Sequence, residues 1–199
     1  MAAKKKAKKK GAKKKSPAKR KAAARKAAPK KVAPKRKAAA KPAPVKGPKV
    51  GDAAPDFTLP TDGTGTITLS ALRGRPVVLY FYPRDDTPGC TMEACGFNDN
   101  LPNFSGLNAE IIGVSKDNES SHARFRDKFG LKFKLAADTE TKVAKAYGVW
   151  VEKSLYGRKY MGMDRATYLI DKDGTIRGVW RSVKVPGHVD AVLAAAQAL

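Results

Sequence analysis

The sequence predicts an α/β fold in which a mixed central sheet is flanked by helices and is preceded by a disordered basic tail. Apolar runs at 76–82 and 111–114 are typical of strands that are covered on both faces. A helical pattern at 118–129 alternates with them. Further along, Asp171-Lys172-Asp173-Gly174 is a strong hairpin signal between two more strands. Alternating elements followed by a hairpin and a last helix favour a mixed sheet with helices on both faces.

Charge divides the chain into two parts. Residues 1–49 carry 22 of the 41 Lys and Arg residues and none of the 18 Asp and Glu residues, so they supply nearly all of the net charge of +23. This segment is mostly Lys, Ala and Pro, has no aromatic residue, and cannot bury enough apolar surface to offset the entropy of ordering. We therefore expect a disordered tail over 1–49 and one folded domain over 50–199, which is long enough to bury a core.

Composition also bears on the compartment. The N-terminus lacks the apolar run of a secretory signal, and no stretch approaches the length of a membrane span. The two cysteines, Cys90 and Cys95, do not form a disulfide framework, which indicates reactive thiols in a reducing compartment. We expect a cytoplasmic protein without a membrane partner, associated with the nucleoid in a bacterium or located in the nucleus of a eukaryote.

The first half of the domain contains the strand that leads to the cysteines. The continuous apolar run at 76–82 predicts a central strand, and 87–104 predicts a loop that enters a helix, with Pro102 disturbing its end. Before these elements the pattern predicts a short strand at 57–59, a half-buried strand at 66–69 and a turn from Ser70 to Gly74.

The second half of the domain continues the alternation. A strand is expected at 111–114, and a helix at 118–129 that stops at Gly130. The remaining elements expected are a strand at 133–136, a helix from Asp138 to Tyr147-Gly148, strands at 166–170 and 175–180, and a helix at 187–199.

Cys90 lies where the helix after the central strand is expected to begin. A thiol reacts as its thiolate, and the first turn of a helix favours this charged form through unpaired N–H groups and a partial positive charge. Thr87 can offer a hydroxyl to an incoming oxygen, and Pro83 can shield the pocket from water. The pattern therefore predicts a nucleophilic thiolate at Cys90.

Cys95 follows five positions later. In an intact helix this spacing separates the two Cα atoms by roughly 7.5 Å along the axis and places the side chains on different faces. A disulfide requires Cα atoms within about 7 Å. We therefore expect that Cys90 and Cys95 bond only if the helix unwinds locally, which Gly96 would ease because it has no side chain to pack.

Taken together, these residues resemble a known family. The pattern Pro83-x-x-x-Thr87-x-x-Cys90 is similar to the active-site motif of peroxiredoxins. With Cys95 five positions on, it resembles the Q-type subgroup, also called bacterioferritin comigratory proteins. The resemblance extends from Val50 to Leu199 and includes the segments GDAAPDFTLP at 51–60, AKAYGVW at 144–150, YMGMDRATYLID at 160–171 and VPGHV at 185–189.

The resemblance implies a thioredoxin fold and the thiol-dependent reduction of hydrogen peroxide and organic hydroperoxides. It assigns Cys90 as the peroxidatic cysteine and Cys95 as the resolving cysteine, with Thr87 and Arg165 completing the peroxide pocket. Glu93 would orient Arg165 across the site. It further implies recycling by thioredoxin or a similar dithiol, and a monomer. No cofactor is expected, because no Gly-rich phosphate loop follows a strand.

The tail lies outside this resemblance. Its lysine clusters, separated by Ala and Pro, resemble linker-histone tails and the extensions of some bacterial nucleoid proteins. Such a chain neutralises phosphates without reading sequence, so we expect residues 1–49 to bind nucleic acid non-specifically. A solubilising extension and a nuclear-import signal are the alternatives.

Three other interpretations of the cysteines remain. A zinc site with His122 and His188 is disfavoured by the spacing, and both histidines are expected to face solvent or to cap helices. A nucleoid-binding redox sensor would use the same thiol pair but would recycle slowly. A general disulfide oxidoreductase would require C-x-x-C in place of the spacing between Cys90 and Cys95.

Overall fold

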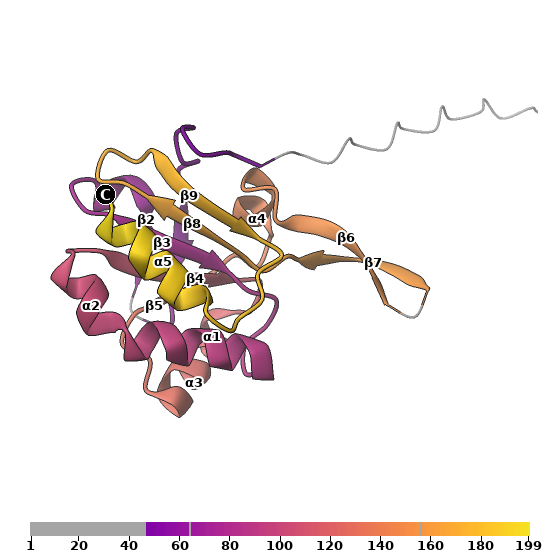
Figure 1. The fold of residues 1–199 in the computed structure, drawn as a ribbon. Helices are drawn as coiled ribbons and strands as arrows, with labels where there is room; N and C mark the ends of the chain where they lie inside the picture. Colours follow the sequence, from indigo (N-terminus) through magenta and orange to yellow (C-terminus); the bar gives the residue numbers. More distant parts are fainter. Residues whose placement is uncertain (1–46, 64, 156) are drawn as a thin grey trace, which may run out of the picture. The chain divides into compact units, whose positions relative to one another are not determined.

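The computed structural model describes residues 47–63, 65–155 and 157–199 (Figure 1). Nearly all of the tail lies outside these residues, so its predicted disorder stays a prediction. Strand β3 (Val77–Phe81) lies at the centre of a five-stranded sheet with the order β5-β4-β3-β8-β9, and all five of its residues are buried. The sequence-based prediction of a central strand is confirmed.

The sheet is mixed, as expected. Strand β3 runs parallel to β4 (Glu110–Ser115), which runs parallel to β5 (Lys134–Ala137). On its other side β3 pairs antiparallel with β8 (Ala166–Ile170), which pairs antiparallel with β9 (Ile176–Arg181). The predicted turn joins β8 to β9, and Gly174 adopts a positive φ of 79° there.

Alternating side chains of β3 divide the core between the two faces of the sheet. Val78 and Tyr80 belong to one buried cluster, while Val77, Leu79 and Phe81 belong to the other. The first cluster includes residues from four helices, which are α1 (Pro88–Asp99), α2 (Leu101–Gly106), α3 (Glu119–Phe129) and α5 (His188–Gln197). These helices cover one face of the sheet (Figure 1).

The second cluster is closed by smaller elements. They are the hairpin of β1 (Thr58–Pro60) and β2 (Thr66–Thr68), the 3-10 helix η1 (Leu69–Leu72), and helix α4 (Lys142–Ala146). Helices therefore lie on both faces of the sheet, but four of those described lie on the face that carries α1.

Helix boundaries follow local chemistry with one correction. The Asn118 side chain caps α3 by accepting from the Ser121 amide at 2.9 Å, and Gly130 ends that helix with a φ of 62°. The segment 87–104 was expected to be a loop that enters one helix, with Pro102 disturbing its end, but it contains two helices that are divided at Asn100. Pro102 therefore lies in the first turn of α2, where a missing N–H costs no helical hydrogen bond.

One pair of strands was not predicted. Strands β6 (Trp150–Leu155) and β7 (Arg158–Met163) form an antiparallel hairpin that extends away from the five-stranded sheet (Figure 1). Among the described residues, no helix is both long enough and apolar enough to cross a membrane.

Candidate active site

Cys90 lies in the first turn of α1, directly after the loop that leaves the central strand. Thr87 is the N-cap residue and has extended backbone angles, and Pro88 and Gly89 are the first two helical residues. The first turn leaves the amides of Gly89 and Cys90 without an intrahelical acceptor. The Cys90 side chain is only 1% exposed and belongs to the core cluster beneath the helices. The predicted placement of this thiol at a helix N-terminus is confirmed.

Arg165 reaches this thiol from a distant part of the chain. It follows β7 and precedes β8, and the pairing of Phe81 with Ala166 brings this position beside the end of β3. Its Nη2 atom donates a hydrogen bond to Cys90 Sγ at 3.2 Å. A Cβ atom at Gly89 would lie 3.2 Å from the same Nη2 atom, so a larger residue there would require the Arg165 guanidinium to shift by a few tenths of an ångström.

Glu93 is the second group of α1 that Arg165 contacts. It lies one turn after Cys90, is fully buried, and accepts a hydrogen bond from Arg165 Nη1 through Oε2. Burial raises the pKa of Glu93 to about 7, although the charge and hydrogen bond of Arg165 act in the opposite direction. For Arg165 itself, burial alone would lower the pKa, but the charges of Glu93 and Cys90 raise it.

His188 is the first residue of α5, and its ring lies beside Glu93 at this site. Its Nε2 atom is 2.7 Å from Thr167 Oγ1 and 4.0 Å from Glu93 Oε1, an oxygen that has no hydrogen-bond partner in the described part of the chain. Burial and the charge of Arg165 lower the pKa of His188 to about 4, so the ring is neutral at pH 7. The expectation that His188 faces solvent or caps a helix is wrong, because its ring is a buried part of the core.

Cys95 belongs to the same helix as Cys90, and α1 is continuous across both residues. Both thiols are free, and Cys95 is partly exposed whereas Cys90 is buried. Burial and the nearby charge of Asp99 raise the pKa of Cys95. Gly96 packs against α5, since a Cβ atom there would meet Val189 Cγ2 at 3.2 Å. The structure therefore contains the reduced pair in an intact helix.

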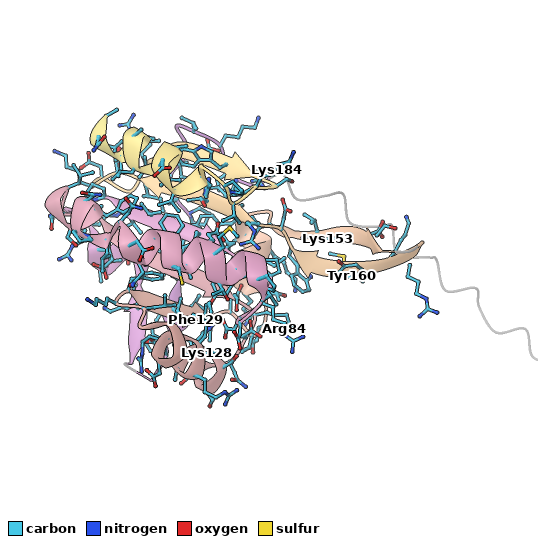
Figure 2. All side chains as sticks on the ribbon, turned by 60° about the horizontal axis from the view of Figure 1, so that its bottom comes forward. Arg84, Lys128, Phe129, Lys153, Tyr160 and Lys184 are labelled. Carbon is cyan, nitrogen blue, oxygen red and sulfur yellow. The ribbon has the colours of Figure 1, made fainter. Side chains whose placement is uncertain are left out.

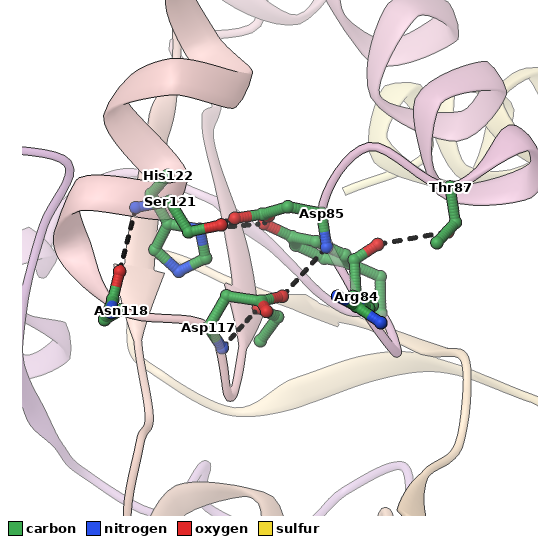
Figure 3. A network of polar contacts seen from close by, with 9 residues as sticks. Arg84, Asp85, Thr87, Asp117, Asn118, Ser121 and His122 are labelled. Atoms are coloured by element: carbon green, nitrogen blue, oxygen red, sulfur yellow. Dashed lines mark hydrogen bonds and ion pairs between the residues drawn. The ribbon is translucent and has the colours of Figure 1, made fainter. Parts of the chain in front are cut away.

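Polar contacts connect the loop before α1 to the start of α3 (Figure 3). His122 is completely buried, and its Nδ1 atom lies 3.0 Å from Asp85 Oδ2. Burial acts to raise the pKa of Asp85, but hydrogen bonding and charge from His122 outweigh it and the pKa is lowered. The expectation of an exposed or capping His122 is therefore wrong. The sequence does indicate that His122 is buried, because His122 and Phe125 are three residues apart and therefore lie on the same, inner face of α3.

Thr87 and Pro83 lie at opposite ends of this loop. The Thr87 hydroxyl donates to the Arg84 carbonyl at 3.1 Å, and its oxygen can still accept a further hydrogen bond. Pro83 is exposed. Its predicted shielding of the thiol stays a prediction.

A surface depression of about 410 Å³ borders the same loop. Pro83 and Arg84 line it on one side, and Trp150, Lys153 and Tyr160 of the β6–β7 hairpin line it on the other. Lys153 and Tyr160 project from this hairpin in Figure 2. The β6–β7 hairpin therefore lines one side of this depression with aromatic and basic side chains.

No group of three or more His, Cys, Asp and Glu side chains in residues 47–63, 65–155 and 157–199 is arranged to hold a metal ion. His122 and His188 lie on different helices, and each faces its own polar partner, Asp85 and Thr167.

Comparison with known proteins gives consistent matches. The model of the AhpC/TSA family matches residues 50–179. A putative peroxiredoxin Bcp of Coxiella burnetii is 48% identical over 145 residues, which cover 73% of this chain and 96% of that protein. The peroxiredoxin Bcp of Bacillus subtilis is also 48% identical over 145 residues, covering 73% of this chain and 92% of that protein.

Solved structures agree with the sequence matches. The bacterioferritin comigratory protein of Xanthomonas campestris, described for its alkyl peroxide reduction activity, is 43% identical with a TM-score of 0.69, and the match covers 71% of this chain and 90% of that one. A cysteine-to-serine mutant of Xylella fastidiosa PrxQ is 39% identical with a TM-score of 0.72, and covers 75% and 96% of the two chains.

Proposed function

Because this chain belongs to the AhpC/TSA family and is a thiol-dependent peroxidase of the peroxiredoxin Bcp/PrxQ type, we propose that Cys90 is its peroxidatic cysteine and Cys95 its resolving cysteine. The domain has the thioredoxin fold. The observation that carries the assignment of Cys90 is its hydrogen bond from Arg165 Nη2 at 3.2 Å, made at the N-terminus of a helix. A fixed cation and free helical amides stabilise a thiolate at this position.

In the first step the Cys90 thiolate attacks the terminal oxygen of a hydroperoxide. The S–O bond forms as the O–O bond breaks, so sulfur is oxidised to a sulfenic acid and the departing alkoxide or hydroxide takes up a proton. Arg165 stabilises the thiolate before the attack and the leaving oxygen after it. Thr87 and the free amides of the first turn orient the peroxide.

In the second step Cys95 condenses with the sulfenic acid of Cys90. The Cys95 sulfur displaces the hydroxyl group, a disulfide forms and water leaves. Because the two residues are five positions apart in a continuous helix, this step requires local unwinding of α1. An external dithiol, which we propose to be thioredoxin, then reduces the disulfide by exchange and becomes oxidised itself.

The test of this chemistry is hydrogen peroxide consumption coupled to thioredoxin and NADPH oxidation. We expect Cys90→Ser to abolish turnover, and Cys95→Ser to react once with peroxide but to lose recycling by thioredoxin. Equal activity of the wild type and Cys90→Ser would refute the assignment of Cys90. Full thioredoxin recycling in Cys95→Ser would refute only the role of Cys95.

For residues 1–49 we propose non-specific binding of nucleic acid. The support is their composition, because 22 cationic side chains without any acidic residue can neutralise phosphates without reading sequence. Gel shift of the full chain, of a protein that starts at Val50, and of a full chain with the tail lysines and arginines replaced by Gln tests this. Only the full chain should bind DNA, and its affinity should fall steeply with salt. Equal weak binding by all three would refute the proposal.

We further propose a monomer in the cytoplasm of a bacterium, held near the nucleoid by this tail. A nucleic-acid-bound redox sensor is the second candidate, favoured only by the charge of residues 1–49. Sustained turnover with a reductant distinguishes the two, since a sensor would be oxidised once and recycle slowly. Light scattering of the full chain tests the monomer.

A further inference from the structure

The loop that carries the chain from β3 into α1 is held by a buried carboxylate. The Asp85 side chain accepts a hydrogen bond from Tyr82 Oη at 2.8 Å, and its two oxygens lie 3.0 and 3.1 Å from His122 Nδ1. The side chains of His122 and Asp85 are 0% and 4% exposed. Tyr82 is equally buried, so all three groups are removed from water.

A second contact holds the backbone of the same residue. The Asp85 amide donates to Asp117 Oδ2 at 2.8 Å, and the Ser115 hydroxyl donates to the same oxygen at 2.8 Å. Ser115 is the last residue of β4, the parallel neighbour of β3. The loop is therefore tied both to the sheet and, through His122, to α3 (Figure 3).

The contacts of Asp85 with Tyr82, His122 and Asp117 form a tether that lies close to the reactive thiol along the chain. Only Asp86 and Thr87 separate Asp85 from the first residue of α1, and Asp86 has a left-handed backbone with a φ of 52°. A non-glycine residue in this region is strained and needs its surroundings to hold it. The exposed ion pair of Asp86 with Lys128 adds little, so the restraint comes from the buried contacts of Asp85.

Stability alone is a weak reason for a buried polar pair such as Asp85 and His122, because well-packed apolar residues of similar volume stabilise a core equally well. A polar pair does, however, fix one geometry, since its hydrogen bonds are directional. Here that geometry sets the direction in which α1 begins. The direction of α1 in turn sets the distance from Cys90 Sγ to Arg165 Nη2.

We propose that Asp85 and His122 are positioning residues for the peroxide step, acting through the loop that places Cys90 and Thr87; this rests on Cys90 being the peroxidatic cysteine. Attack on the O–O bond requires the thiolate, the cation and the peroxide in one arrangement, and a shift of about 1 Å can slow a reaction about 100-fold. Disulfide formation needs no such arrangement, because α1 unwinds for it. Loss of the tether therefore slows the first step and spares the second.

The experiment measures the two steps separately in the full chain. Competition with a haem peroxidase for hydrogen peroxide gives the rate constant of Cys90 oxidation, and mass spectrometry of quenched samples gives the rate of disulfide formation. The variants are Asp85→Asn and His122→Leu, with His122→Asn as the conservative variant because its amide places a donor near the position of Nδ1. Asp138→Asn is the matched control, because Asp138 is also buried and accepts from the Ala144 amide at 2.7 Å, but holds α4.

We expect Asp85→Asn and His122→Leu to lower the rate constant of Cys90 oxidation at least about ten-fold, His122→Asn to recover part of that loss, and Asp138→Asn to stay within about two-fold of the wild type. The rate of disulfide formation should not fall. If His122→Leu does not fold, Tyr82→Phe, which removes one hydrogen bond to Asp85, takes its place and should show a smaller loss of the same kind.

Folded variants that oxidise within two-fold of the wild type would overturn the proposal, as would an equal loss in Asp138→Asn. A wild type without Cys90-dependent peroxide consumption would instead overturn the proposed function, so the two failures are distinguishable.

Discussion

Replacement of Glu93 by Gln should stabilise the reduced protein above neutral pH and leave its stability nearly unchanged at low pH. Glu93 is fully buried, and its pKa rises from 4.5 to about 7 on folding. Between these values the folded protein binds a proton that the unfolded chain has released. The free energy of unfolding of the wild type therefore falls as pH rises through this window. The amide has no proton to lose, so the variant lacks this fall.

The magnitude follows from the size of the shift. A change from 4.5 to about 7 corresponds to about 3 kcal/mol when each pKa unit is worth about 1.4 kcal/mol. The difference in unfolding free energy, variant minus wild type, should rise by up to about 3 kcal/mol from pH 4 to pH 8. Other groups that titrate in both proteins cancel in this difference.

Urea unfolding of both proteins at intervals from pH 4 to pH 8, in a phosphine reductant that keeps both cysteines reduced, measures this difference. Glu140→Gln is the control, because Glu140 is exposed and its ion pair with Lys142 lowers its pKa. For that variant the difference should be small and should run in the opposite direction. A Glu93→Gln difference that stays flat, or that falls between pH 4.5 and 7, would refute the assignment of a protonated buried carboxyl group.

Three further outcomes are expected. Arg165→Lys should lower the rate constant of peroxide reduction about 100-fold, because a single ammonium cannot replace the planar fork that contacts both Cys90 and Glu93; a rate near that of the wild type in the same competition assay would contradict this. Gly89→Ala should slow peroxide reduction several-fold, since its Cβ, 3.2 Å from Arg165 Nη2, would shift the guanidinium by a few tenths of an ångström, while urea unfolding shows no loss of stability. Leu79→Ala should cost about 2–5 kcal/mol in urea unfolding because Leu79 is fully buried in the central strand, and a loss below 1 kcal/mol would indicate that the core rearranges.

The parts of the fold that could be predicted are those with a strong local pattern. The apolar run at 76–82 indicated a strand covered on both faces, and the structure places β3 there at the centre of the sheet. Residues 171–174 carried their own turn chemistry, so the β8–β9 hairpin was predictable. In each case neighbouring residues alone contain the information.

The β6–β7 hairpin was not predicted, because its strands lack a strong local pattern. A half-buried strand alternates apolar and polar residues, but Arg158, Lys159, Tyr160 and Met161 of β7 are all exposed. Without a buried face the period-two pattern is absent, and pairing between the two strands supplies the regularity.

The position of His188 shows which features of the site the sequence indicates and which it does not. His188, Val192 and Ala196 recur every four residues along α5, a spacing that places all three on the buried face. That pattern indicates burial of His188, but not the Thr167 hydroxyl that satisfies its ring, because Thr167 belongs to β8. Hydrogen bonds between side chains of different elements depend on the tertiary structure, so local sequence patterns do not reveal them.

The contacts of Arg165 with Cys90 and Glu93 depend on whether α1 is an intact helix. Cys90 and Glu93 are three residues apart, so an intact helix presents both to one side, where a single guanidinium can contact both. A bond between Cys90 and Cys95 requires this part of the helix to unwind, which would move the sulfur away from Glu93 and from Arg165. The geometry that stabilises the thiolate would then exist only in the reduced protein. In the cycle that we propose, reduction of the disulfide must therefore restore the helix as well as the thiol before the next peroxide can react.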